Sequence, residues 1–145
     1  MPPGCGHGIL SFDSDKTMNQ DRATSRLKAL ADPNRLRILR ILEQEEISVS
    51  ELTEILGMVQ SRVSGHLGVL RDAGLVRHRR QGTSAFYSLA EEGEPHATWV
   101  AVRETLPEPE ETVADRHRLA DTLSRRRERT REFFDRAAAA WDESR

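Results

Sequence analysis

The sequence contains one cysteine, Cys5, and no long run of apolar residues. A single cysteine cannot build an intramolecular disulfide framework, which fits a reducing compartment. Because no apolar run approaches the roughly 20 residues that cross a bilayer, we expect no membrane contact. Residues 1–16 lack the basic start and the apolar stretch of a signal peptide. These absences together predict a cytoplasmic protein.

The sequence also lacks the residue patterns that indicate a catalytic site. It offers no Ser-His-Asp or Cys-His arrangement, no glycine-rich loop that would cradle a phosphate, and no convincing cluster of metal ligands. Its many carboxylates alternate with arginines along expected helices, and exposed ion pairs account for that pattern. We therefore expect no enzymatic activity and no cofactor.

The composition fits a folded domain with appended helices. Of the 145 residues, 37% are apolar and 32% are charged, too apolar for a disordered polymer. The net charge of −2 hides an asymmetry, because residues 60–84 carry five arginines against the single acid Asp72, whereas the segments on both sides are acidic. A basic island suits a polyanionic partner such as DNA, since the partner responds to the local field. A solvated surface patch is the alternative.

The chain divides into three expected parts. Residues 1–19 show no hydrophobic periodicity and contain several glycines and prolines, which predicts a flexible arm. Residues 20–106 carry the periodic segments of a folded domain, and residues 107–145 form a helical extension that follows Pro107 and Pro109.

Helices are predicted at each end of the domain and in the extension. The first spans about 22–31, with Leu27 and Leu30 facing inward, and the next runs from Pro33 to Gln44 behind an Asp32 cap. Further helices are expected over about 90–105 and 112–141.

The middle of the chain predicts two helices, a turn and a hairpin. Ser48 and Glu51 fit a capping box for a short helix that ends at Gly57. A second helix follows over about 60–73, and its inner face consists of Val63, Leu67 and Leu70. Two β-type runs, 75–80 and 83–89, are joined by Gln81-Gly82, where glycine can supply the positive φ of a hairpin turn.

This order offers a helix to the major groove of DNA and a basic wing to its backbone. Gln60 and Ser61 lie at the start of the second helix, the end that reads bases in helix-turn-helix proteins. Glutamine pairs with adenine and arginine with guanine, although Arg62 and Arg71 would alternatively hold phosphates. The hairpin tip either contacts DNA or only solubilises the loop, and His66 either touches DNA or packs. The DNA-binding candidates are Gln60, Ser61, Arg62, Ser64, His66, Arg71, Arg77, Arg79, Arg80, Gln81 and Thr83.

Two segments carry a family resemblance, LADPNRLRIL at 30–39 and the stretch SELTEILGMVQSRVSGHLGVLRDAGLVRHRRQGTSAFYSL at 50–89. They resemble the ArsR/SmtB family of winged-helix repressors. The resemblance implies a mainly α fold with a small β-hairpin, a winged helix-turn-helix, and an extended C-terminal helix. It also implies a homodimer, packed through its first and last helices, that binds a palindromic double-stranded DNA operator. Such proteins release DNA when an inducer binds, which makes an unidentified small molecule a further expected partner.

The residues depart from the metal-binding patterns of this family. Arsenic- and lead-type sensors carry thiols where this chain has residues 47–50, and hydroxyls there cannot replace thiolates. Redox-type members need two cysteines. Asp115-x-His117 is similar to half of a zinc site, and Cys5-x-His7 offers two ligands in the arm. We expect no metal, with Cys5, His7, Asp115 and His117 as weak candidates; a metal-sensing repressor that uses the Cys/His arm is an alternative function.

The C-terminal residues 114–145 carry a second resemblance. ADRHRLADTLSRRRERTREFFDRAAAAWDESR is similar to the linker helix that leads into a fused S-adenosylmethionine-dependent methyltransferase domain in some family members. A regulatory fragment of such a fusion is therefore a further alternative, although no methyl-transfer site is expected in these residues. Phe133, Phe134 and Trp141 indicate either packing within the protein or its dimer, or a protein-binding helix.

Overall fold

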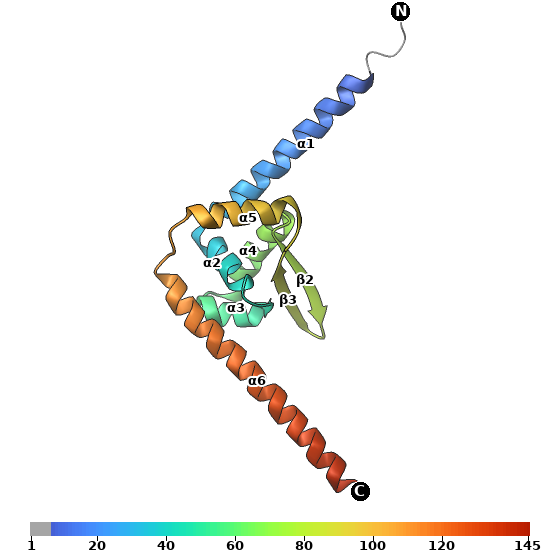
Figure 1. Cartoon of the computed structure of the whole chain (residues 1–145), viewed down its shortest axis with the longest axis vertical. Helices are drawn as coiled ribbons and strands as arrows, with labels where there is room; N and C mark the ends of the chain where they lie inside the picture. The colour runs from blue at the N-terminus through green and yellow to red at the C-terminus, as the bar shows by residue number, and fades with distance from the viewer. Residues whose placement is uncertain (1–6) are drawn as a thin grey trace, which may run out of the picture.

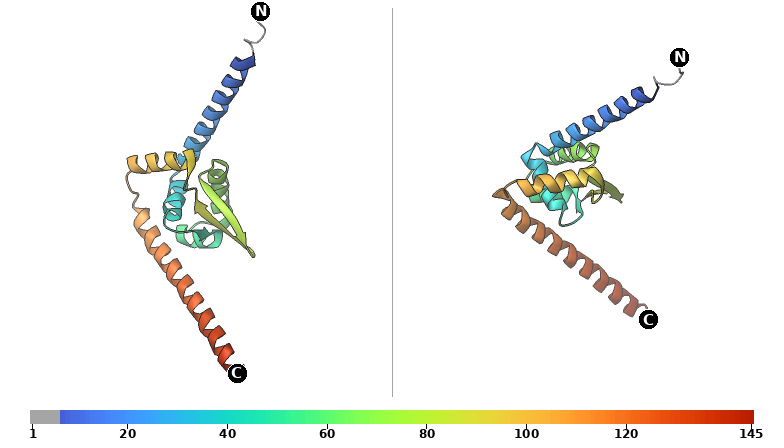
Figure 2. Two further views of the ribbon diagram at one scale, coloured as in Figure 1. Left: turned by 45° about the vertical axis from the view of Figure 1, so that its right-hand side comes forward. Right: turned by 45° about the horizontal axis from the view of Figure 1, so that its top comes forward.

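The computed structural model describes the backbone of residues 7–145 and the side chains from Lys16 onward. In that part of the chain, a small antiparallel sheet lies at one side of a helical body, and α1 and α6 project from the body in different directions (Figures 1 and 2). The elements are α1 (His7–Leu30), α2 (Pro33–Leu42), β1 (Ile47–Ser48), α3 (Val49–Leu56), α4 (Gln60–Asp72), β2 (Val76–Gln81), β3 (Ser84–Leu89), α5 (Gly93–Thr105) and α6 (Glu111–Glu143).

The core lies where α2, α3 and α4 meet, and it fixes the orientation of α4. The predicted inner face of that helix is confirmed, because Val63, Leu67 and Leu70 are each 0% exposed. Trp99 of α5 and Ile47 of β1 are equally buried beside them. Full burial of such a side chain stabilises the fold by roughly 1.5–3 kcal/mol relative to exposure. With one face of α4 committed to the core, the opposite face must point outward.

Local signals set the ends of the central helices as predicted. Asp32 accepts hydrogen bonds from the backbone N–H groups of Asn34 and Arg35 at 2.8 and 3.2 Å. Ser48 and Glu51 form the capping box of α3. Gly57 then adopts a left-handed φ of 65°, which lets the chain reverse before α4 begins.

The sheet has the order β1-β3-β2, and its hairpin differs slightly from the prediction. Gln81 pairs with Ser84, so the turn consists of Gly82 and Thr83, one residue later than the expected Gln81-Gly82. Gly82 takes the first turn position with a φ of 63°, which suits glycine. Strand β1 was not predicted, because two residues are too few to show an alternating pattern.

Helix α1 corrects the expectation of an irregular arm over residues 1–19. It begins at His7, and the chain from 9 to 32 contains neither glycine nor proline to interrupt it. Its amphipathic pattern is weak because only its C-terminal end contacts the body, through Ala29 and Leu30. Leu27, expected to face inward, is 56% exposed. Cys5 lies outside the described residues.

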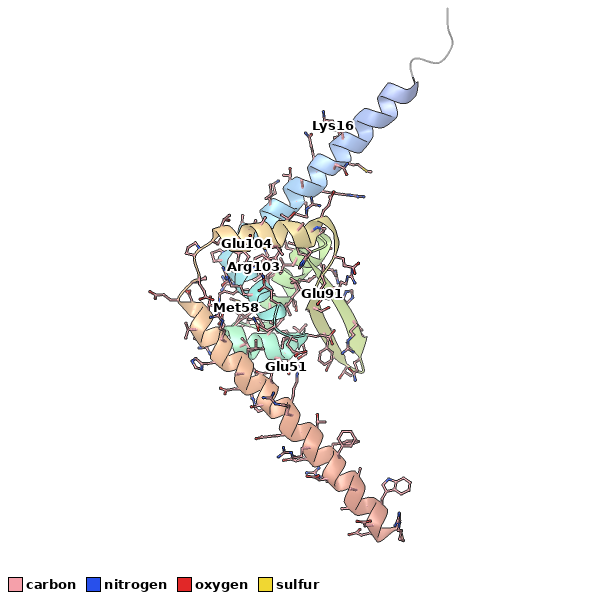
Figure 3. All side chains as sticks on the ribbon, in the orientation of Figure 1. Lys16, Glu51, Met58, Glu91, Arg103 and Glu104 are labelled. Carbon is pink, nitrogen blue, oxygen red and sulfur yellow. The ribbon has the colours of Figure 1, made fainter. Side chains whose placement is uncertain are left out.

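Helix α6 packs along α2 and α3 over its first half and then leaves the body (Figures 1 and 3). Phe133, Phe134 and Trp141 on its outer half are exposed, so they do not pack within the chain. Packing in a dimer and a protein-binding role both stay predictions. No helix among residues 7–145 combines the length and the apolar character that a membrane span requires.

Candidate nucleic-acid interface

The outward face of α4 is a strip of residues with little or no side chain. Since successive residues of an α-helix turn by about 100°, Ser61, Gly65 and Gly68 lie opposite the buried face. No heavy atom of another element lies within 4 Å of the position where a Cβ would stand on either glycine. Nothing else in the described chain covers this strip, so a partner with a groove as wide as a helix can approach the backbone of α4 closely.

One flank of the strip forms a groove with the wing. Gln60 and Ser64 face the wing and line a groove of about 340 Å³ with Arg80 and Thr83 of the hairpin. No acidic side chain lines this groove, and Arg80 is its only cation. The groove therefore combines hydrogen-bonding groups and a positive charge, which suits a phosphate backbone.

The cations of the interface are mostly without internal partners. Among the described residues, Arg62, Arg71, Arg77 and Arg80 are exposed and form no ion pair. Arg79 differs, because its guanidinium contacts Glu46 at 2.5 Å, donates to Gln81 at 3.0 Å and lies over the Phe86 ring. The hydrogen bonds that Arg79 donates to the Glu46 carboxylate raise the pKa of Arg79. Arg79 thus contributes less free positive charge than its sequence position suggested.

His66 differs from the other DNA-binding candidates in its burial, because the other ten are exposed. It is half-buried on the flank of α4 that faces α2, with its Nδ1 atom 3.5 Å from Nη1 of Arg35. Of the ten exposed candidates, four lie together in one groove between α4 and the hairpin: Gln60, Ser64, Arg80 and Thr83. Arg79 and Gln81 line a separate groove beside Glu46 and α6.

The start of α4 is also free of a side-chain cap. Its N-cap residue is Val59, which makes no capping hydrogen bond. The first N–H groups of a helix need an external acceptor, and helix N-termini attract anions. A phosphate oxygen can serve as that acceptor when DNA is present.

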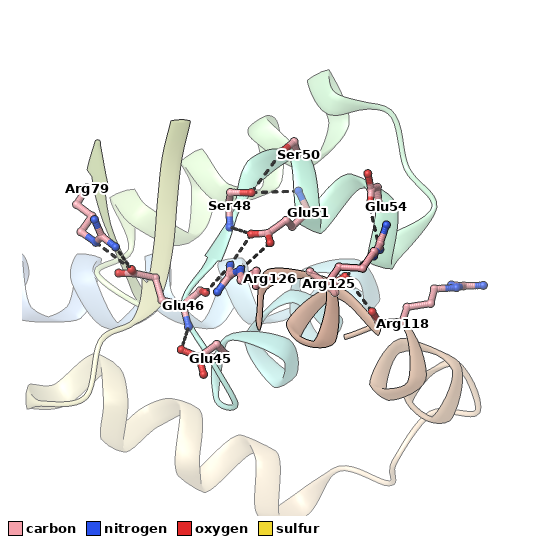
Figure 4. A network of polar contacts seen from close by, with 11 residues as sticks. Glu45, Glu46, Ser48, Ser50, Glu51, Glu54, Arg79, Arg118, Arg125 and Arg126 are labelled. Carbon is pink, nitrogen blue, oxygen red and sulfur yellow. Dashed lines mark hydrogen bonds and ion pairs between the residues drawn. The ribbon is translucent and has the colours of Figure 1, made fainter. Parts of the chain in front are cut away.

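An ion-pair network that the sequence did not indicate ties α6 to the helix-turn-helix and the wing (Figure 4). Arg126 donates two hydrogen bonds to the Glu51 carboxylate, at 2.7 and 2.5 Å, and a third to the Glu46 carbonyl oxygen at 3.0 Å. Arg125 reaches Glu54, and Arg118 donates to the Ile55 carbonyl oxygen. The partners lie far apart in the sequence, so local spacing could not reveal them; the run of arginines at 125–127 is the only signal.

A buried ion pair holds the first half of α6 on α2 and accounts for one of the weak metal candidates. The guanidinium of Arg37 donates to both carboxylate oxygens of Asp115, at 2.9 and 2.8 Å. Asp115 is buried, whereas His117 points to solvent. The described residues include no group of three or more metal-ligating side chains. Cys5 and the His7 side chain lie outside the described residues.

We predict that the Glu51 contact makes stability depend on pH. Burial opposes ionisation of Glu51, but hydrogen bonds from Arg126 and Ser48 outweigh it and hold its pKa below the ordinary 4.5. A lowered folded pKa contributes stability that is complete above the ordinary value and is lost as the pH falls through the folded pKa. The free energy of unfolding should therefore decrease as the pH drops from about 6 to about 3.

Urea unfolding of the wild type and of Glu51→Gln across that pH range tests the assignment. The free energy of unfolding of the variant should change less with pH than that of the wild type. Part of the change that remains should come from Asp32, whose pKa is also lowered. Glu128→Gln, which alters an exposed carboxylate of α6, is the control and should follow the wild type. Identical pH profiles for the wild type and Glu51→Gln would contradict the assignment.

Comparison with known proteins places this arrangement in a family. Residues 32–78 match the family model described as "Bacterial regulatory protein, arsR family". The chain is 43% identical to a transcriptional repressor SmtB homolog of Synechocystis sp. over 57% of its own length, and the match spans 59% of that relative. It is 42% identical to the regulator NmtR of Mycobacterium tuberculosis, with 58% of this chain and 73% of the relative covered.

Solved structures also resemble part of the chain. HlyU from Vibrio cholerae superposes with a TM-score of 0.53 at 38% identity, covering 59% of this chain and 92% of that one. A homodimeric winged helix-turn-helix DNA-binding domain from Mycobacterium bovis gives a TM-score of 0.55 at 35% identity, covering 70% of this chain and 86% of that one. These similarities show that the chain belongs to the ArsR family of bacterial regulatory proteins.

Proposed function

We propose that this protein regulates transcription by binding a palindromic operator as a homodimer, with α4 in the major groove and the β2–β3 wing on the flanking backbone. The observation that carries the proposal is the bare outward strip of α4, bordered by an acid-free groove and by arginines that lack internal partners. A helix without bulky outward side chains fits between the phosphate ridges, and the free cations match the polyanion.

Relatives support the homodimer, but their names include both directions of regulation. One structural neighbour is named a homodimeric DNA-binding domain. A two-fold dimer would place two copies of α4 about one helical turn of DNA apart, roughly 34 Å, which requires a palindromic site. One relative is named a repressor and another, HlyU, an activator. We infer that the bound protein covers its operator, so that repression is the expected outcome.

Three arginine variants test the division between base reading and backbone contact. Arg62→Ala should weaken binding to the operator by about 10- to 100-fold and relax base preference at one position per half-site. Arg80→Ala should weaken operator and random DNA alike and make the salt dependence shallower, because it removes a phosphate contact from each protomer. Arg79→Ala should have the smallest effect of the three, because its charge is balanced by Glu46.

Fluorescence anisotropy with labelled operator and scrambled duplexes, at several salt concentrations, measures all three variants. If Arg62→Ala and Arg80→Ala lowered affinity for both duplexes by the same factor, the proposed division would be wrong.

A further inference from the structure

A small cavity, partly open to solvent, lies between α2 and the first turns of α6, away from the DNA-binding face. Its volume is about 40 Å³. A water molecule needs roughly 10–15 Å³ by the same measure, so the space fits a few non-hydrogen atoms. Ile41 and Leu119, 3% and 5% exposed, supply apolar wall, and charged groups of both helices supply the rest.

Two of the residues that line this cavity each carry a buried polar atom without a hydrogen-bond partner. The two atoms are Oγ1 of Thr112, whose residue is 4% exposed, and Nε of Arg40. The described side chains contain five such atoms, and two of them belong to residues that line this one cavity. An unpaired buried polar group costs about 1–3 kcal/mol, and natural proteins rarely leave one without a water, ion or ligand.

The charges around the cavity favour an anion. Arg37 pairs with Asp115, Glu43 pairs with Arg103, and Arg116 pairs with Glu108. Arg40 forms no ion pair within the described residues, so one positive charge in the lining is left uncompensated. Both orphan atoms belong to groups that donate hydrogen bonds, and an oxyanion accepts from both.

We propose that this cavity binds a small aliphatic carboxylate. Its oxygens would accept hydrogen bonds from Nε–H of Arg40 and from the Thr112 hydroxyl, and its short tail would contact Ile41 and Leu119. Such a ligand bridges α2 and α6 and therefore binds only while α6 is docked. Because α6 also holds Glu51 through Arg126, occupancy stabilises the contact between α6 and the helix-turn-helix.

Calorimetry and thermal unfolding of the full chain with acetate, propionate and butyrate, in chloride buffer, test the binding. At about ten times the dissociation constant, the best-fitting acid should raise the melting temperature by about 3 °C or more. Propionamide, which has the same size but no charge, should bind at least about 10-fold more weakly than propionate.

Two substitutions assign the site. Arg40→Gln and Thr112→Val should each weaken the carboxylate by about 10-fold or more. Thr112→Val keeps the side-chain shape and removes the orphan hydroxyl, so its fold should be at least as stable as the wild type. Arg127→Gln, an exposed arginine on the same helix, should bind like the wild type.

Three results would overturn the site: no binding of any acid up to about 10 mM, equal binding of propionate and propionamide, or unchanged affinity in both cavity variants. Any of the three would indicate that the cavity holds water alone. The expectation that the acid changes operator affinity rests on the proposed function, and a separate DNA titration measures it. The acid should change operator affinity in the wild type but not in Thr112→Val, whereas calorimetry reports the site even if no DNA binds.

Discussion

Gly65→Glu is expected to abolish operator binding while leaving the fold intact or slightly more stable. Gly65 lies at the centre of the outward strip of α4, where an added Cβ meets no atom within 4 Å. Glycine in a helix interior costs about 1 kcal/mol relative to alanine, so a helix-favouring residue should raise the free energy of unfolding by about 0.5–1 kcal/mol. In the DNA complex the same side chain would place bulk and negative charge against the bases.

The loss of affinity should reach about 100-fold or more, because a homodimer carries the substitution in both half-sites. Ala120→Glu adds the same charge to an exposed position of α6 and should bind operator within about 3-fold of the wild type. Operator titration and urea unfolding of both variants give the two readouts. Wild-type affinity in Gly65→Glu would show that this strip does not contact DNA.

Arg37→Met is expected to destabilise the protein by about 3 kcal/mol or more and to release α6 from the body. The substitution leaves the buried Asp115 carboxylate without its bidentate partner, and Arg118, at 3.9 Å, is a poor replacement. Breaking one side of a buried ion pair typically costs 3–5 kcal/mol, on the order of a third of a small domain's stability. Urea unfolding measures the loss, and amide hydrogen exchange shows whether the first half of α6 opens.

Two variants separate buried charge from general packing. Arg116→Met, a substitution on α6 like Asp115→Leu, removes only the exposed ion pair with Glu108 and should cost less than about 1 kcal/mol. Replacing both buried partners, as Arg37→Met with Asp115→Leu, should recover most of the lost stability, because no isolated charge remains. If Arg37→Met lost no more stability than Arg116→Met, the Arg37–Asp115 ion pair would not be the main contact that holds α6 on α2.

The central elements were predictable because their signals are local. A capping box needs residues three apart, the inner face of α4 needs Val63, Leu67 and Leu70 on one helix, and the hairpin needs a glycine between two β-type runs. The basic island at 60–84 followed from counting charges. These features suffice to predict a helix beside a wing, and they predict that the DNA-binding candidates lie on those two elements.

The flanking parts were less predictable because their determinants are long-range. Asp115 was read with His117 as half of a zinc site, but its partner is Arg37, 78 residues earlier. His66 was ambiguous because only the packing of α4 against α2 decides which way it faces. The start of α1 was missed because a helix that contacts little of the body carries almost no amphipathic pattern.

Helix α6 is linked by ion pairs and hydrogen bonds to the elements on both sides of α4. Its first half is fastened to α2 by Arg37–Asp115 and to α3 by Arg126–Glu51, and Glu46 links the same region to the wing through Arg79. Movement of α6 would therefore disturb α3 and the wing, the two elements that flank α4. This coupling makes the seam between α2 and α6 a suitable place for a regulatory ligand.

The most direct test of the central claim is binding of the full chain to a duplex from the region upstream of its own gene, compared with a scrambled duplex of equal length. We expect a preference of at least about 1000-fold at physiological salt, and an affinity that falls with salt with a logarithmic slope of roughly −4 to −7, because each dimer should make several phosphate contacts. Equal affinity for the two duplexes, or an affinity that salt does not change, would contradict the central claim.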